Sequence, residues 1–172
     1  MTRILKHIIT PALLLTLLTG CGFQLRGNID IPQEWLALHL VTSSPNGELA
    51  KGVRSSLSNN GVQWLAANEA NYVLQLGAEK YERRNLSIGA NARAAEFELT
   101  LSTTLQVRNA KGEVVVPQSD LVVHKIMTHD PDNVTGKVEE SNLLRREMRQ
   151  ELVQQLMRNI RFAATSGVAK AN

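Results

Sequence analysis

Few residues of this 172-residue chain have side chains that could carry out covalent or acid–base chemistry. Cys21 is the only cysteine, so an intramolecular disulfide and a cysteine-based metal cluster are both excluded. His124 and His129 are an odd number of positions apart on a predicted strand, so they would point to opposite faces. No phosphate-binding glycine loop or nucleophile-elbow motif occurs. The sequence therefore predicts a protein that is not an enzyme, with no cofactor and no metal.

The first 20 residues have the layout of a secretory signal peptide. Arg3 and Lys6 form a basic start, and an apolar run from Ile8 to Leu18 follows. That run is too short to cross a membrane as a permanent helix, and small residues come directly after it. We therefore expect residues 1–20 to be removed.

Cys21 follows the apolar run directly, and Leu18-Thr19-Gly20-Cys21 resembles the bacterial lipobox. The resemblance implies that the thiol is acylated and that the chain is cut before the cysteine; the alternative is a free thiol near the terminus. Several acyl chains give a stable anchor, at about 0.8 kcal/mol per buried CH₂. Residue 22 is Gly rather than Asp. By resemblance to sorted lipoproteins, this favours the outer membrane, with the anchor in its periplasmic leaflet.

Loss of the signal peptide removes two basic residues and no acids, which leaves 17 basic and 16 acidic residues. A nucleic-acid-binding protein should keep a large basic excess. The near-balanced charge therefore argues against a nucleic-acid partner.

Apolar periodicity predicts four strands and two helices in a single domain at residues 35–164. The expected strands are residues 36–41, 72–88, 97–108 and 114–127; one helix is capped by Asn46 and ends before Gly61, and the other covers residues 139–163. Residues 21–34 are expected to be a lipidated tether, and residues 165–172 a flexible tail.

The clearest pattern is the strict alternation from Phe97 to Arg108, which indicates a strand with one buried and one wet face. Two amphipathic helices could both cover the apolar face of such a sheet. The predicted fold class is therefore α+β: a two-layer sandwich of a four-stranded, mostly antiparallel sheet with two amphipathic helices on one face.

Basic residues gather at two places that could bind an anionic partner. Residues 83–95, the predicted hairpin tip, include Arg83, Arg84 and Arg93 and no acid up to residue 95. Lys137 precedes the predicted last helix. The tip is either a solvated hairpin end or a contact site for an anionic amphiphile or an acidic protein surface. The arginines at positions 145, 146 and 149 are expected to face solvent.

The heptapeptide from Cys21 to Gly27 is similar to the start of the lipopolysaccharide-assembly lipoproteins, the plug subunits of the outer-membrane lipopolysaccharide translocon. Shorter matches extend over most of the mature chain. They are Pro45-Asn46-Gly47, Asn60-Gly61-Val62, Ala95-Glu96-Phe97, Asp130-Pro131 and Lys137.

This resemblance implies a protein that sits in the lumen of a β-barrel subunit, supports its assembly and binds lipopolysaccharide. It also implies that Lys137 matches a family residue implicated in lipopolysaccharide contact. Arg93 departs from the pattern by a few positions, and Arg83 and Arg84 are candidates from charge alone. The alternative function is an independent, periplasm-facing lipid carrier or chaperone, which would need an apolar cavity between sheet and helices.

Overall fold

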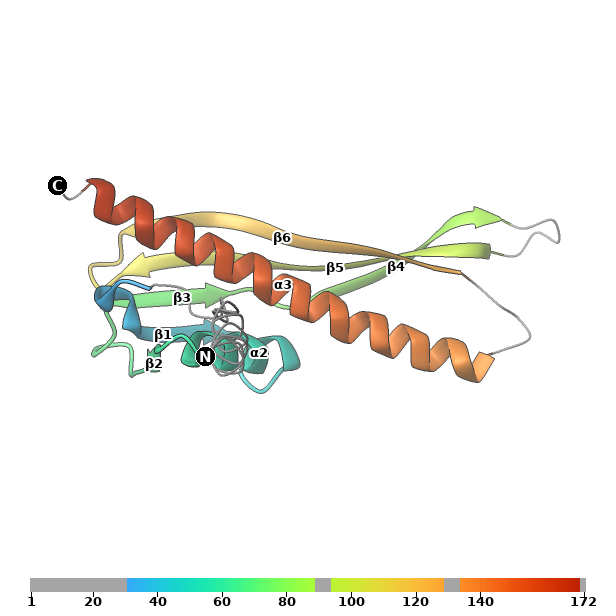
Figure 1. The fold of residues 1–172 in the computed structure, drawn as a ribbon, viewed down its shortest axis with the longest axis horizontal. Helices are drawn as coiled ribbons and strands as arrows, with labels where there is room; N and C mark the ends of the chain where they lie inside the picture. Colours follow the sequence, from blue (N-terminus) through green and yellow to red (C-terminus); the bar gives the residue numbers. More distant parts are fainter. Residues whose placement is uncertain (1–30, 89–93, 129–133, 171–172) are drawn as a thin grey trace, which may run out of the picture.

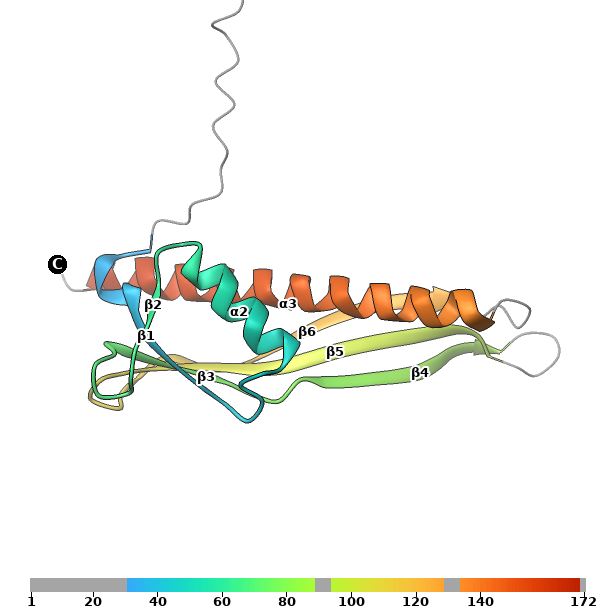
Figure 2. The same cartoon turned by 90° about the horizontal axis from the view of Figure 1, so that it is seen from below.

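The computed structural model describes residues 31–88, 94–128 and 134–170, which form a sheet with helices on one side (Figures 1 and 2). The elements, in chain order, are the 3-10 helix η2 (Gln33–Leu36), β1 (Ala37–Thr42), α2 (Glu48–Ser58), β2 (Gln63–Trp64), β3 (Tyr72–Leu76), β4 (Lys80–Ile88), β5 (Ala94–Asn109), β6 (Val114–Thr128) and α3 (Val134–Lys170).

Strand β5 organises the sheet, because it pairs with β6 along one edge and with β3 and then β4 along the other. These three pairings are antiparallel, whereas β1 pairs in parallel with both β2 and β3. The α+β class is confirmed. The prediction of four mostly antiparallel strands was wrong: within the described residues the sheet has six strands and is mixed.

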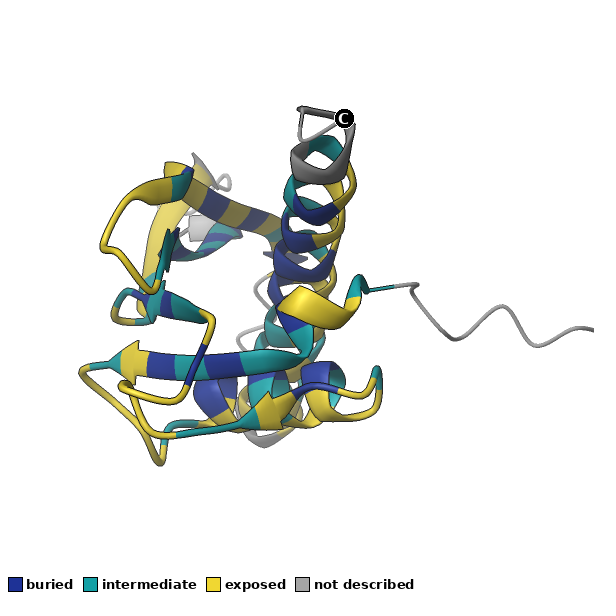
Figure 3. Ribbon diagram, turned by 90° about the vertical axis from the view of Figure 1, so that its left-hand side faces the viewer, coloured by how far each residue is buried: buried dark blue, intermediate teal, exposed yellow. Residues whose placement is uncertain are grey.

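As predicted, the alternating residues of β5 give the strand one buried face and one partly exposed face. Leu99, Leu101, Leu105 and Val107 are completely buried, while their neighbours along the strand are partly exposed. The buried side chains meet the stripe of α3 formed by Met148, Leu152, Leu156 and Ile160, each at most 1% exposed. Figure 3 shows these buried faces turned toward the interior between the sheet and α3.

The segment that was predicted to be one strand, residues 72–88, is divided at Gly77 into β3 and β4. The Gly77 amide donates to the Thr104 carbonyl at 2.9 Å, and Thr103 Oγ1 donates to the Gly77 carbonyl at 3.0 Å. A Cβ at position 77 would lie 2.3 Å from Thr104 Oγ1. Only glycine lets the chain approach β5 this closely at the point where β3 gives way to β4.

Helix α2 buries the predicted stripe of Leu49, Val53 and Leu57. Its N-cap, however, is Gly47 rather than Asn46, and no side chain caps it. Gly52 faces α3, where a Cβ would lie 3.3 Å from Val153 Cγ2. The small residue therefore allows the two helices to pack closely, and this packing supplies the tertiary support that a glycine-containing helix requires.

Helix α3 is longer than predicted. It begins at Val134 rather than at residue 139, and it continues to Lys170, through most of the segment expected to be a flexible tail. The helix extends along the long axis of the molecule (Figure 1), whereas α2 packs beside its middle, around residues 146–154. At the end of the domain where α3 finishes, Trp35 of η2 is 2% exposed and stacks on Tyr72. Gln33 and Glu34, which were assigned to the tether, are already part of η2.

Candidate functional site

The predicted cations that the structure describes lie where the β4–β5 hairpin and the start of α3 come to the same end of the molecule (Figure 1). We call this region the tip end. Arg83 pairs with Leu99 in the β4–β5 register, and its guanidinium carbon lies 4.3 Å from the centre of the Phe97 ring. Its side chain is exposed, so the guanidinium that stacks on the ring still presents its charge to solvent.

Arg84 belongs to the opposite face of the sheet. It is the register partner of Glu98, and its Nε donates to Glu98 Oε2 at 2.5 Å. This hydrogen bond holds the pKa of Glu98 below its ordinary value and raises that of Arg84. Arg83 and Arg84, adjacent in sequence, therefore do not form one binding site.

Lys137 lies in the first turn of α3 rather than before the helix. Its Nζ donates to Glu140 Oε2 at 2.7 Å and to Thr128 Oγ1 at 3.4 Å, and its side chain is 19% exposed. Thr128 follows Met127, the register partner of Phe97. Lys137 therefore contacts β6 at Thr128, and Arg83 contacts β5 at Phe97, which pairs with the residue before Thr128. Two further predicted site residues, Cys21 and Arg93, lie outside the described residues.

One cluster of charged residues was not predicted. Arg149 donates to both carboxylate oxygens of Glu79 at 2.8 Å, and Arg145 donates to the same carboxylate at 3.2 Å. The Arg145 guanidinium also lies 4.6 Å from the centre of the Tyr81 ring. The expectation that Arg145 and Arg149 face solvent was wrong, because both reach down to the connection between β3 and β4. The four-residue spacing of the two arginines, with Glu79 directly before a strand, was the available signal.

The contacts in the Glu79 cluster shift the pKa values of Glu79 and Arg149. Burial alone would raise the pKa of Glu79, but hydrogen bonds and charge from Arg149 and Arg145 outweigh it and lower that pKa. The same contact raises the pKa of Arg149. Glu79 and Arg149 are therefore both charged at neutral pH, as in a structural ion pair. A catalytic acid or base would instead need a pKa near the working pH.

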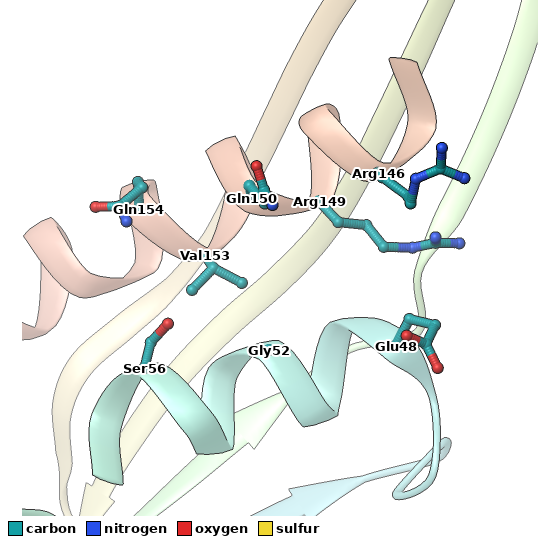
Figure 4. A pocket seen from close by; sticks show the side chains of 8 residues that line it. All are labelled: Glu48, Gly52, Ser56, Arg146, Arg149, Gln150, Val153 and Gln154. Atoms are coloured by element: carbon teal, nitrogen blue, oxygen red, sulfur yellow. The ribbon is translucent and has the colours of Figure 1, made fainter. Parts of the chain in front are cut away.

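A groove of about 270 Å³ lies between α2 and α3 (Figure 4). Glu48, Arg146 and Arg149 line one part of it, and Ser56, Val153 and Gln154 line another. None of the predicted cations at the tip end contributes to it. Among the described residues, no group of three or more His, Cys, Asp or Glu side chains is placed to hold a metal ion. In the same part of the chain, no helix combines the length and apolar character needed to cross a membrane.

Comparison with known proteins places this architecture in a family. The family model for lipopolysaccharide assembly, LptE, matches residues 37–160. The LPS-assembly lipoprotein LptE of Photorhabdus laumondii is 33% identical over 159 residues, which cover 92% of this chain and 85% of the relative.

Solved structures agree with the fold. The rare lipoprotein B of Shewanella oneidensis is 28% identical with a TM-score of 0.66, over 78% of this chain and 98% of that protein. A lipoprotein B from Nitrosomonas europaea has a TM-score of 0.72 over 87% of this chain and 96% of its own; at 19% identity it shows the fold alone. The chain therefore belongs to the LptE lipopolysaccharide-assembly family, and it is an outer-membrane lipoprotein of that assembly process rather than an enzyme.

Proposed function

We propose that this chain forms a heterodimer with the β-barrel subunit of the lipopolysaccharide translocon, plugs the barrel lumen and supports barrel assembly. The observation that carries the proposal is the outward face of β5. Glu98, Thr100, Ser102, Thr104 and Gln106 alternate there with buried residues. A polar sheet face suits the water-filled interior of an outer-membrane barrel.

The alternative function, an independent lipid carrier, requires a cavity for acyl chains. Large side chains fill the space between β5 and α3 in this structure, including Leu101, Leu105, Leu152 and Leu156, each at most 1% exposed. This filled core favours the plug over the carrier.

Purification of a C-terminally tagged chain from gently solubilised membranes tests the proposal. We expect stoichiometric recovery of an outer-membrane β-barrel, identified by mass spectrometry. Recovery of the chain as a free monomer would support the carrier instead. The same mass analysis tests the anchor, since a bare thiol at Cys21 or an intact leader would contradict acylation.

We further propose that the tip end binds the phosphates of lipopolysaccharide through Lys137, with Arg93 and Arg83 as additional cations. Arg84 is the weakest candidate, because it pairs with Glu98 on the face of the sheet opposite to Arg83. Lys137 and Arg83 lie at the same end of the sheet, and arginine and lysine suit phosphate groups.

The substitution Lys137→Gln should weaken lipopolysaccharide binding by about threefold to tenfold, since one charged hydrogen bond to phosphate would be lost. Lys51→Gln is a matched control, because Lys51 also pairs with a glutamate three positions away, at 3.0 Å, but on α2. Binding can be measured by titration of immobilised protein at moderate salt. Equal affinities for the two variants would remove Lys137 from the site.

A further inference from the structure

The last part of α3 differs in charge from the rest of the helix. No acidic residue follows Glu151 in the sequence, whereas Arg158 and Arg161 are exposed about two and three turns later. Between these arginines and the end of the helix, Phe162 is 74% exposed, more than any other large hydrophobic residue that the structure describes. An aromatic ring in water beside two cations is an unusual surface for a wholly solvated helix.

Phe162 also borders an apolar groove. Together with Ala163, it faces Val115, Val116 and Pro117 at the start of β6 across a hollow of about 540 Å³. The apolar surface therefore continues from the helix onto the sheet. We call Arg158, Arg161, Phe162 and residues 115–117 the α3-end surface.

The α3-end surface lies at the end of the molecule where the described chain begins. Figures 1 and 2 both place η2 beside the C-terminal part of α3. Ile31 already packs against the core, so it is a fixed point from which the preceding residues start. The chain makes ten residue-to-residue steps from Cys21 to Ile31, which can span at most about 35 Å. Acyl chains on Cys21 would therefore hold a membrane within that distance of this end.

We infer that the α3-end surface rests on the periplasmic lipid leaflet of the membrane that carries the anchor. Aromatic side chains are favoured at the membrane interface, and arginines can pair with the phosphates of anionic lipids. The polar interior of an outer-membrane barrel would not suit the groove beside Phe162. This inference rests on the acylation of Cys21 proposed above, and it gives the protein two points of membrane contact, the anchor and the end of α3.

The test uses the chain as purified from cell membranes, placed in vesicles of phosphatidylethanolamine and phosphatidylglycerol that contain nitroxide-labelled lipids. An environment-sensitive fluorophore is attached at Phe162→Cys or, as a control, at Leu143→Cys. Leu143 is 49% exposed on the other half of the same helix. We expect the nitroxide lipids to quench the label at position 162 at least about threefold more than the label at 143. Reversing both charges, Arg158→Glu with Arg161→Glu, should reduce that difference.

Flotation of the same vesicles separates the possible failures. Protein that does not float would refute the acylation of Cys21 and, with it, this inference. Protein that floats but shows equal quenching at the two positions would overturn the inference alone. The inference would also be overturned if the label at position 162 changed its emission only when the barrel partner was added. The α3-end surface would then contact a protein rather than lipid.

Discussion

Glu79 connects the sheet to the N-terminal half of α3. Its carboxylate lies in the short connection between β3 and β4 and accepts hydrogen bonds from Arg145 and Arg149, which are one helical turn apart. Its side chain is only 17% exposed, so the contact is better shielded from solvent than a surface ion pair. Removal of the carboxylate would leave two partly buried guanidinium groups without their anionic partner.

The substitution Glu79→Gln should therefore destabilise the fold by about 1–3 kcal/mol, since partly buried charges would lose charged hydrogen bonds. Glu82→Gln is the control: Glu82 pairs with Lys80 at 2.6 Å, but both side chains are more than half exposed. We expect the control to change stability by less than about 0.5 kcal/mol. Urea denaturation followed by circular dichroism measures both. Equal urea midpoints would contradict a structural role for Glu79.

The same residue predicts a pH dependence with a definite sign. The pKa of Glu79 is lowered in the folded state, so its stabilising effect is fully present above the ordinary carboxyl value of 4.5. The effect is lost as the pH falls through the lower pKa of the folded protein. The difference in unfolding free energy between the parent and Glu79→Gln should therefore be constant near neutral pH and shrink in acid. A difference that grows below pH 4.5 would contradict this assignment.

Residue types were easier to read from the sequence than residue partners. Arg149 was expected in solvent because a charged side chain on an amphipathic helix usually points there. Its partner Glu79, 70 positions away, becomes visible only when the helix is laid across the sheet. Arg83 and Arg84 were grouped because they are adjacent, although neighbouring residues of a strand point to opposite faces.

At the scale of elements, Gly77 gives the sharpest prediction. Gly77→Ala should destabilise the protein by about 1–3 kcal/mol, because the added Cβ would meet Thr104 Oγ1 at 2.3 Å and the strand would have to move. Adding Thr104→Ala removes that oxygen and should recover part of the loss. A double-mutant cycle from thermal or urea denaturation measures the coupling between the two positions. If the stability changes of Gly77→Ala and Thr104→Ala simply add, contact with Thr104 Oγ1 is not the reason that position 77 requires glycine.

Elements with one buried face were predictable, and those defined by a single contact were not. The alternation in β5 and the four-residue steps of α3 result from burial on one side, so they are visible in the sequence. Strand β2 is two residues long and shows no period. The division between β3 and β4 depends on the approach of Gly77 to Thr104, which the sequence alone does not reveal.

At the scale of the whole molecule, β6 is a 15-residue strand at the edge of the sheet, paired in the described structure only with β5. Long open edges invite pairing with other chains. Here α3 lies along the edge. Lys125 of β6 forms an ion pair with Glu151, and Gln155 Nε2 donates to the Val122 carbonyl at 3.1 Å. An inward-facing charge and a capped carbonyl both hinder the addition of another strand.

Removing these two features should therefore expose the edge. In the chain from residue 22 onward, Lys125→Val with Gln155→Ala should raise the self-association constant by at least about tenfold, because an apolar side chain would replace the charge and the Val122 carbonyl would become available for pairing. Sedimentation velocity over a range of concentrations measures this. Lys111→Val with Gln154→Ala alters the same residue types at exposed positions of the β5–β6 turn and α3 and serves as the control. If both double variants associate equally, added hydrophobicity rather than the open edge is the cause. If neither associates, the Lys125 and Gln155 side chains are not what protects β6.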